Sequence, residues 1–166
     1  MMGCRTFGYD DPRRMPLYLL NNLLGGPGMN ARLNLSLRER HGLVYTVEST
    51  LATYSDTGYW SVYFGCDHHD VSRCQRLIRH ELDRYCQHQL SNRQLTTAKR
   101  QLKGQLAIAC DNREQYALDM AKHFLHYGKQ RDFDELMLRI DAITAQQVQD
   151  IACQLMNPDN LQTLIL

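Results

Sequence analysis

The sequence lacks the features that mark several large classes of protein. No apolar run approaches the roughly 20 residues that a membrane-spanning helix needs. The N-terminus has no secretory signal pattern. Neither charge dominates, because 19 lysines and arginines are balanced by 18 aspartates and glutamates among the 166 residues. We therefore expect neither a membrane nor a nucleic acid as a partner.

Paired cysteine motifs are also absent. The six cysteines are scattered, with no C-x-x-C pair, at Cys4, Cys66, Cys74, Cys86, Cys110 and Cys153. In a chain of this length, that distribution is typical of reduced, packed thiols rather than of a disulfide framework or a zinc knuckle. It favours a reducing compartment such as the cytoplasm. There is no internal repeat or low-complexity linker, so residues 1–166 are predicted to form a single domain.

What the chain does contain is a set of strands and helices that do not alternate. Strand patterns are found at residues 1–9, 42–50 and 58–66 and in the last six residues. Helical patterns are found at 12–24, 29–41, 113–127 and 133–140, and others begin near residues 70, 91 and 144. This order predicts an α+β fold of two layers, in which helices pack on one face of a mixed or antiparallel sheet of about four strands.

Two neighbouring strands are expected to pair as an antiparallel hairpin. Period-2 alternation would place Leu43, Tyr45 and Val47 on one face of the first strand. The segment 54–58 is rich in turn residues and joins this strand to the second one, 58–66.

The glycine-rich stretch GGPGMNARL, residues 25–33, resembles a phosphate-binding loop only superficially. It lacks the G-K-[ST] ending, and it follows a helix, whereas phosphate-binding loops follow a strand. A helix end followed by a tight turn explains these glycines better.

The segment DHHD, residues 67–70, offers four possible metal ligands in a row. Adjacent side chains after a strand are expected to point apart, so they would not easily converge on one ion. Asp70 is better explained as the N-cap of the next helix.

The remaining histidines and nucleophiles form no known catalytic pattern. His123 and His126 lie on one helix face, but no third ligand accompanies them, so a solvated or partly packed pair is expected. His80, Glu81 and His88 complete neither H-E-x-x-H nor H-x-x-E-H. There is no G-x-S-x-G elbow and no cysteine in an activating context. We expect this chain to bind no metal.

The stretch LRERHGLVY, residues 37–45, carries the best candidate site. Arg38 lies near a helix end and Tyr45 lies two residues into the next strand, while Gly42 allows a sharp reversal between them. The two tips could reach a common point, where two donors would suit a peptide carbonyl or the oxyanion that develops on it. The ordinary alternative is an arginine that stabilises the helix dipole and a half-buried strand tyrosine, and spacing alone favours that alternative.

Three longer stretches together resemble a known family. LLGGPGMNARLNLSLRERHGLVYTVES, GYWSVYFGCD and RIDAITAQQVQDIACQLMNPDNLQTLIL are similar to the C-terminal half of the insulinase/pitrilysin family of zinc peptidases, which includes mitochondrial processing peptidase. The resemblance covers essentially the whole chain. It implies the processing-peptidase fold, in which tandem α+β halves close around a peptide substrate.

The resemblance also implies roles for particular residues. In the family, the C-terminal half contributes an arginine and a tyrosine that hold the substrate and stabilise the tetrahedral intermediate, and these correspond to Arg38 and Tyr45. The glycine-rich loop of the processing peptidases handles substrate, which implies substrate binding for Gly25, Gly26 and Gly28.

The zinc-binding half implied by the family is absent from this sequence. That half carries H-x-x-E-H and a further glutamate, so zinc would belong to the full-length peptidase and not to this chain. The expected partner is a zinc-bearing N-terminal half, in the same chain or in a second one, and a homodimer is a further possibility. Alone, the chain is expected to be inactive. The alternatives are a non-catalytic partner subunit of the same family, or a peptide-binding module that uses an exposed sheet edge.

Overall fold

The computed structural model describes residues 1–130 and 132–166. The elements, in chain order, are β1 (Met2–Thr6), α1 (Arg14–Gly25), the π-helix η1 (Asn34–Glu39), β2 (Val44–Thr53), β3 (Gly58–Cys66), the 3-10 turn η2 (His68–Asp70), α2 (Val71–Gln87), α3 (Asn92–Ala109), α4 (Arg113–Tyr127), α5 (Phe133–Asp141), α6 (Ala145–Leu155), the 3-10 turn η3 (Pro158–Asn160) and β4 (Gln162–Thr163).

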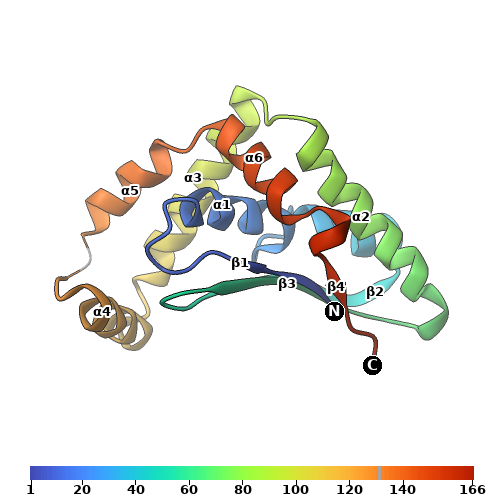
Figure 1. The fold of residues 1–166 in the computed structure, drawn as a ribbon, viewed down its shortest axis with the longest axis horizontal. Coiled ribbons are helices and arrows are strands. Elements are labelled where there is room, and N and C mark those ends of the chain that lie inside the picture. The colour runs from blue at the N-terminus through green and yellow to red at the C-terminus, as the bar shows by residue number, and fades with distance from the viewer. Residues whose placement is uncertain (131) are drawn as a thin grey trace.

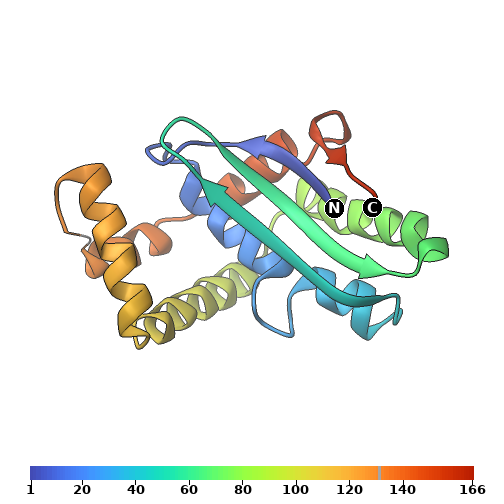
Figure 2. The same ribbon diagram turned by 90° about the horizontal axis from the view of Figure 1, so that it is seen from below.

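The strands form one four-stranded sheet in the order β2-β3-β1-β4, and every pair is antiparallel. The helices cover one face of this sheet, and the opposite face is open (Figures 1 and 2). The predicted α+β fold is therefore confirmed, and the sheet is antiparallel rather than mixed. Because β2 is an edge strand, one side of its backbone has no neighbouring strand among the described residues.

The core lies between the sheet and the helices. Trp60 and Val62 point from β3 toward the helices and are fully buried. Leu20 of α1 and Ile78 of α2 are equally buried on the helical side. Full burial of an aliphatic side chain of this size stabilises a fold by about 1.5–3 kcal/mol, so this layer supplies much of the stability.

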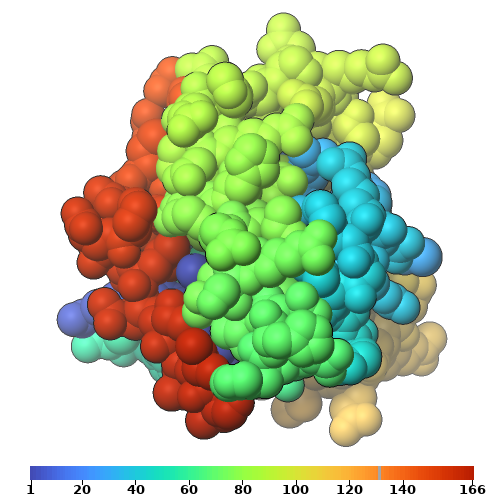
Figure 3. Space-filling view, turned by 90° about the vertical axis from the view of Figure 1, so that its right-hand side faces the viewer, coloured from blue at the N-terminus to red at the C-terminus, as the bar shows by residue number. Residues whose placement is uncertain are grey.

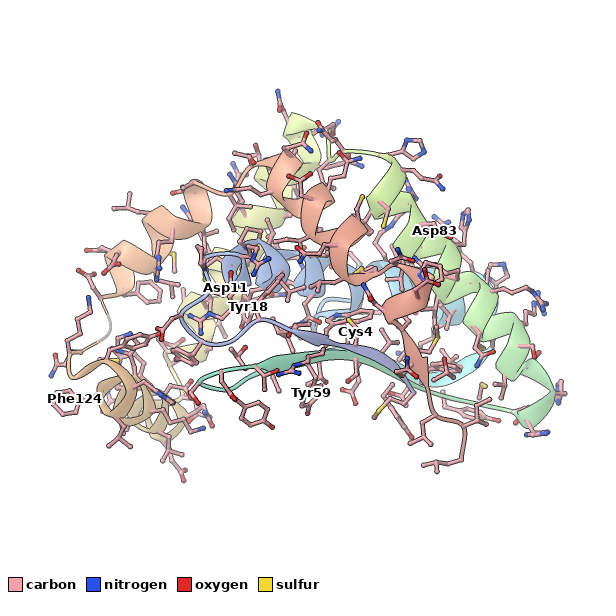
Figure 4. All side chains as sticks on the ribbon, viewed as in Figure 1. Cys4, Asp11, Tyr18, Tyr59, Asp83 and Phe124 are labelled. Atoms are coloured by element: carbon pink, nitrogen blue, oxygen red, sulfur yellow. The ribbon has the colours of Figure 1, made fainter. Side chains whose placement is uncertain are left out.

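The open face of the sheet carries exposed and polar side chains. Tyr59 and Tyr63 alternate with the buried residues of β3, and Figure 4 shows Tyr59 pointing away from the helices. Tyr63 lies opposite Glu48 of β2. At the far edge of the sheet the chain ends meet, because the Met1 amino group donates to the Leu164 carbonyl oxygen at 2.8 Å.

The most distinct difference from the sequence-based expectation is the helix predicted for residues 29–41. The main helical segment within this range is the π-helix η1. Met29 lies outside η1, and 75% of its surface is exposed. Leu33 and Leu37 are fully buried as predicted. The apolar spacing thus identified the buried face but not the wider helical turn.

The first and last strands are shorter than predicted. The strand expected at 1–9 ends at Thr6, and the strand expected over the final six residues is confined to Gln162–Thr163. The long helices agree well with the predicted ranges, and α4 ends at Gly128 in the left-handed conformation (φ 67°). No helix in the described part of the chain is both long and apolar enough to cross a membrane.

Candidate functional site

A groove of about 560 Å³ runs beside the free edge of β2. One wall is formed by β2 over residues 46–49, and the opposite wall is formed by α3. Arg38, the glycine-rich loop and residues of α1 also line it. The structure therefore brings Arg38 together with Gly25, Gly26 and Gly28 in one hollow.

The glycine-rich loop is held close to the sheet. A side chain at position 25 would place its Cβ atom 2.6 Å from the backbone nitrogen of Ser49, so only glycine allows α1 to end against β2. The loop is also tied to α3, because the Asn30 amide donates to the Gln101 side-chain oxygen at 2.8 Å. The loop is thus a fixed wall of the groove.

Asn21 anchors this end of α1 to two strands. Its side-chain oxygen accepts hydrogen bonds from Ser49 Oγ at 2.7 Å and from Trp60 Nε1 at 3.0 Å. Asn21 also lines the groove. We did not predict this role from the sequence; the available signal was a polar residue among the apolar residues at the end of the helix.

Arg38 lies on irregular backbone. It belongs to the π-helix η1, in which the Arg40 amide donates to the Leu35 carbonyl, five residues earlier. The π-helix ends at Glu39, and the chain reverses at Gly42, whose φ of 61° is left-handed and whose amide donates to the Arg38 carbonyl at 2.9 Å. π-Helical turns are frequent at functional sites. The Arg38 side chain is exposed, and among the described residues it has no carboxylate partner.

Tyr45 occupies a β-bulge. Val44 pairs with Cys66 and Thr46 with Gly65, so Tyr45 is the extra residue between them. The bulge turns its side chain outward, and 74% of the surface of Tyr45 is exposed. The predicted common face of Leu43, Tyr45 and Val47 is therefore wrong for Tyr45, and the expectation of a half-buried tyrosine is wrong as well.

The Tyr45 hydroxyl donates to Asp67 Oδ1 at 2.7 Å. This hydrogen bond raises the pKa of Tyr45, because ionising the phenol would place two negative charges side by side. The phenol thus stays a proton donor at neutral pH. The pairing of the start of β2 with the end of β3 brings Asp67 here, and tracing the predicted hairpin to its ends could have suggested this partner.

Arg38 and Tyr45 do not line the same hollow in this structure. The groove lining includes Arg38 and begins along β2 at Thr46, one residue after Tyr45. Tyr45 instead turns to Asp67. Convergence of the two tips on one substrate atom stays a prediction.

The segment 67–70 differs from its predicted geometry. Side-chain ligand atoms of Asp67, His69 and Asp70 lie within 4.8 Å of one another, so three of the four side chains do converge. Asp70 occupies the N-cap position of α2, but its side chain accepts no capping hydrogen bond and instead lies 3.3 Å from His69 Nε2. The reason is the 3-10 turn η2, which folds the segment back on itself.

This cluster does not fit the zinc site that the resemblance implies. That site needs two histidines and a glutamate, whereas the cluster has one histidine and two aspartates at the molecular surface. It is the one such cluster found within residues 1–130 and 132–166. His123 and His126 instead pack in the aromatic group around Tyr9 and Tyr127.

Comparison with known proteins defines the family. Residues 1–102 match the family described as "Peptidase M16 inactive domain". The chain belongs to the M16 peptidase family, and its match is to the inactive domain of that family.

The relatives and solved structures agree with this assignment. An uncharacterised zinc protease of Streptomyces coelicolor is 31% identical over 152 residues, which are 92% of this chain and 33% of that protein. The mitochondrial-processing peptidase subunit beta of Rattus norvegicus is 28% identical over 157 residues, which are 90% of this chain and 32% of that protein. The solved peptidase M16 inactive domain from Pseudomonas fluorescens is 21% identical with a TM-score of 0.77, and the match covers 96% of this chain and 39% of that one. The chain thus spans about a third of the length of these curated relatives.

Proposed function

We propose that this chain is the C-terminal, substrate-binding half of a zinc-dependent metalloendopeptidase. The observation that carries the proposal is the groove beside the edge strand β2, which gathers Arg38 and the glycine-rich loop, with Tyr45 at the adjoining bulge. An extended peptide could lie along the free edge of β2 and pair with its backbone. Zinc and the general base would come from the N-terminal half, in the same chain or in a partner chain.

The groove residues support a division of labour with that half. When bound in the other half, zinc supplies Lewis acidity and an activated water. Arg38 offers a guanidinium without a carboxylate partner in the described structure, and Tyr45 offers a phenol that is protonated at neutral pH. Once the Tyr45 hydroxyl exchanges Asp67 for the substrate, the two donors would hold the substrate carbonyl and stabilise the negative charge that develops on its oxygen. Gly25, Gly26 and Gly28 would let the peptide backbone approach closely.

The test uses the full-length protein that contains this chain. Arg38→Ala and Tyr45→Phe should each lower kcat about 100-fold, with a smaller change in KM, if the two donors act in the transition state. Arg40→Ala and Tyr63→Phe are matched controls, because both residues are exposed and neither lines the groove. Unchanged kinetics in both site variants would refute the site assignment.

A second experiment tests the missing half directly. The isolated 166-residue chain should not cleave peptides, with or without added zinc, because the His and Asp cluster found among its described residues does not match the zinc site of the family. Zinc-dependent cleavage by the isolated chain would contradict the proposal.

A non-catalytic partner subunit is the second candidate. One relative is itself named as a subunit, the mitochondrial-processing peptidase subunit beta. The sequence upstream of this chain, or of its partner, separates the two candidates. An intact H-x-x-E-H motif with a later glutamate would indicate the peptidase. A degenerate motif both upstream of this chain and in its partner would indicate the structural subunit.

A further inference from the structure

A second hollow, of about 550 Å³, lies on the helical side of the molecule where α2 ends and α3 begins. Figure 3 looks onto α2, which lies between the C-terminal segment and the residues around η1. The hollow is separated from the groove by the hydrogen-bonded side chains of Asn30 and Gln101, which tie the glycine-rich loop to α3. It is therefore a distinct site from the candidate substrate groove.

The lining of this hollow is basic. Arg84 comes from the last turn of α2, His88 is the residue directly after this helix, Arg93 comes from the first turn of α3, and Arg32 comes from the chain just before η1. No aspartate or glutamate is among the lining residues that the structure describes. The whole chain has a formal net charge of only +1, so this concentration of positive charge is local.

Two of the arginines are free to bind a ligand. Arg84 and Arg93 are exposed, and neither has a carboxylate within ion-pair distance in the described part of the chain. Arg32 is different, because its Nε lies 3.4 Å from the carboxylate of the buried Glu81. Arg84 and Arg93 are therefore the cations that would meet an anion. The charge of Arg32 is balanced by Glu81, but its Nη2 atom has no hydrogen-bond partner among the described residues.

The floor of the hollow contains a buried donor without a protein partner. This donor is Arg32 Nη2, which is buried and has no hydrogen-bond partner among the described residues. Tyr85, only 7% exposed, lies beside it in the lining. Burial raises the pKa of Tyr85, so its phenol remains protonated. Its hydroxyl can therefore donate a hydrogen bond to an anion. A buried guanidinium nitrogen left without a partner costs free energy, which a ligand oxygen in the hollow would recover.

We propose that this basic hollow is a binding site for a small organic anion that carries two or more phosphoryl or carboxylate groups. Planar guanidinium groups bind such oxyanions through paired hydrogen bonds. The volume of about 550 Å³ falls in the range typical of small-molecule sites and exceeds what a single phosphate would fill. The site requires no catalysis, so it stands independently of the proposed peptidase function.

The test measures binding to the 166-residue chain by calorimetry, with pyrophosphate and citrate as probes at constant ionic strength. We expect saturable one-to-one binding of at least one probe, and the stronger of the two identifies the phosphoryl or the carboxylate class. Arg84→Gln combined with Arg93→Gln should weaken this binding at least tenfold. Tyr85→Phe should weaken it several-fold while preserving the packed ring.

The matched control is Arg73→Gln combined with Arg113→Gln. It removes the same charge from two exposed positions outside the hollow, so binding should be unchanged. Absence of saturable binding to either probe would overturn the proposal. Equal weakening in the control and in the Arg84 and Arg93 variant would overturn it as well, because binding would then reflect net charge alone.

Discussion

The helices α1 and α4 are both rich in apolar residues, but the molecule uses them differently. In α1, seven of the twelve residues are buried, including Leu17, Leu20 and Leu24. In α4, none of the fifteen residues is buried, and Leu125 is 83% exposed. Figure 4 shows Phe124 on the outer side of α4, away from the rest of the chain.

The comparison separates what forms a helix from what fixes it in place. α4 has good local signals: the Asn112 side chain accepts from the Gln115 amide at 3.1 Å, and Gly128 ends the helix in the left-handed conformation. α1 has no side-chain cap and depends on burial and on Asn21. Helix α1, which lines the groove, is therefore held in place by burial rather than by capping.

The largest expected effect comes from core truncation in α1. Leu20→Ala should lower the free energy of unfolding by about 2–5 kcal/mol, because it leaves a cavity in the fully buried layer. Leu125→Ala in α4 is the matched substitution and should change stability by less than about 0.5 kcal/mol. Urea denaturation measures both, and similar losses in the two variants would show that α4 is packed after all.

A smaller effect is expected from Asn21→Ala. The substitution removes the acceptor of the buried Trp60 Nε1 group and should cost about 1–3 kcal/mol. Trp60 is the single tryptophan, so a shift of its fluorescence would report the change directly. Asn92→Ala at an exposed position is the control. An unchanged unfolding midpoint and emission spectrum would show that Asn21 does not anchor α1.

Removing the N-cap side chains of α4 and α3 should affect stability differently, locally in α4 and globally in α3. Asn112→Ala should cost α4 about 1 kcal/mol, visible as faster amide exchange within residues 113–127 but with little change in the global midpoint. Ser91→Ala removes the equivalent cap of α3, whose Ala98 and Leu102 are buried, and should lower the global midpoint. The same pattern of exchange in both variants would contradict this distinction.

The smallest effect is an alkaline loss of stability. Burial raises the pKa of Cys4 in β1 from its ordinary 9.0 to about 11. Partial burial, with a smaller contribution from Asp10, raises the pKa of Tyr127 in α4 to about 12. The unfolded chain releases these protons at lower pH, so stability falls as pH rises, from about pH 9 for Cys4 and about pH 10 for Tyr127. At pH 9.5 the loss from Cys4 should be below about 1 kcal/mol.

Urea midpoints between pH 8 and 10 measure this loss, and Cys4→Ser serves as the comparison. A slope that is the same in Cys4→Ser and in the unmodified chain would exclude Cys4 as its source. Exchange within α4 over the same range would show whether Tyr127 responds at higher pH.

Much of the fold was predictable because its signals are local or periodic. The α+β arrangement, the hairpin and the helix ranges followed from apolar spacing and turn residues, and the long helices agree with the structure. The two irregularities were not predictable from spacing. A π-turn at η1 and a bulge at Tyr45 each change the local geometry by about one residue, and apolar spacing at this length does not distinguish them from regular helix and strand.

The candidate site shows the same limit. Arg38 and Tyr45 were singled out by their chemistry and by the family resemblance, while Asp67 and Asn21 emerged only from tertiary contacts. The convergence in segment 67–70 was also missed, because it depends on the short turn η2 rather than on an extended chain. Residue types thus indicated the chemistry, and pairing between distant segments decided which side chains meet.

The contact between Met1 and Leu164 has a consequence for a gene that encodes residues 1–166 alone. Because the two ends are hydrogen-bonded neighbours on β1 and beside β4, a linker of a few residues could join them without strain. New ends could then be opened in the turn at 54–57 between β2 and β3, whose residues 54–56 are exposed. Such a circular permutant would keep every strand pairing while moving both chain ends to the far end of the hairpin.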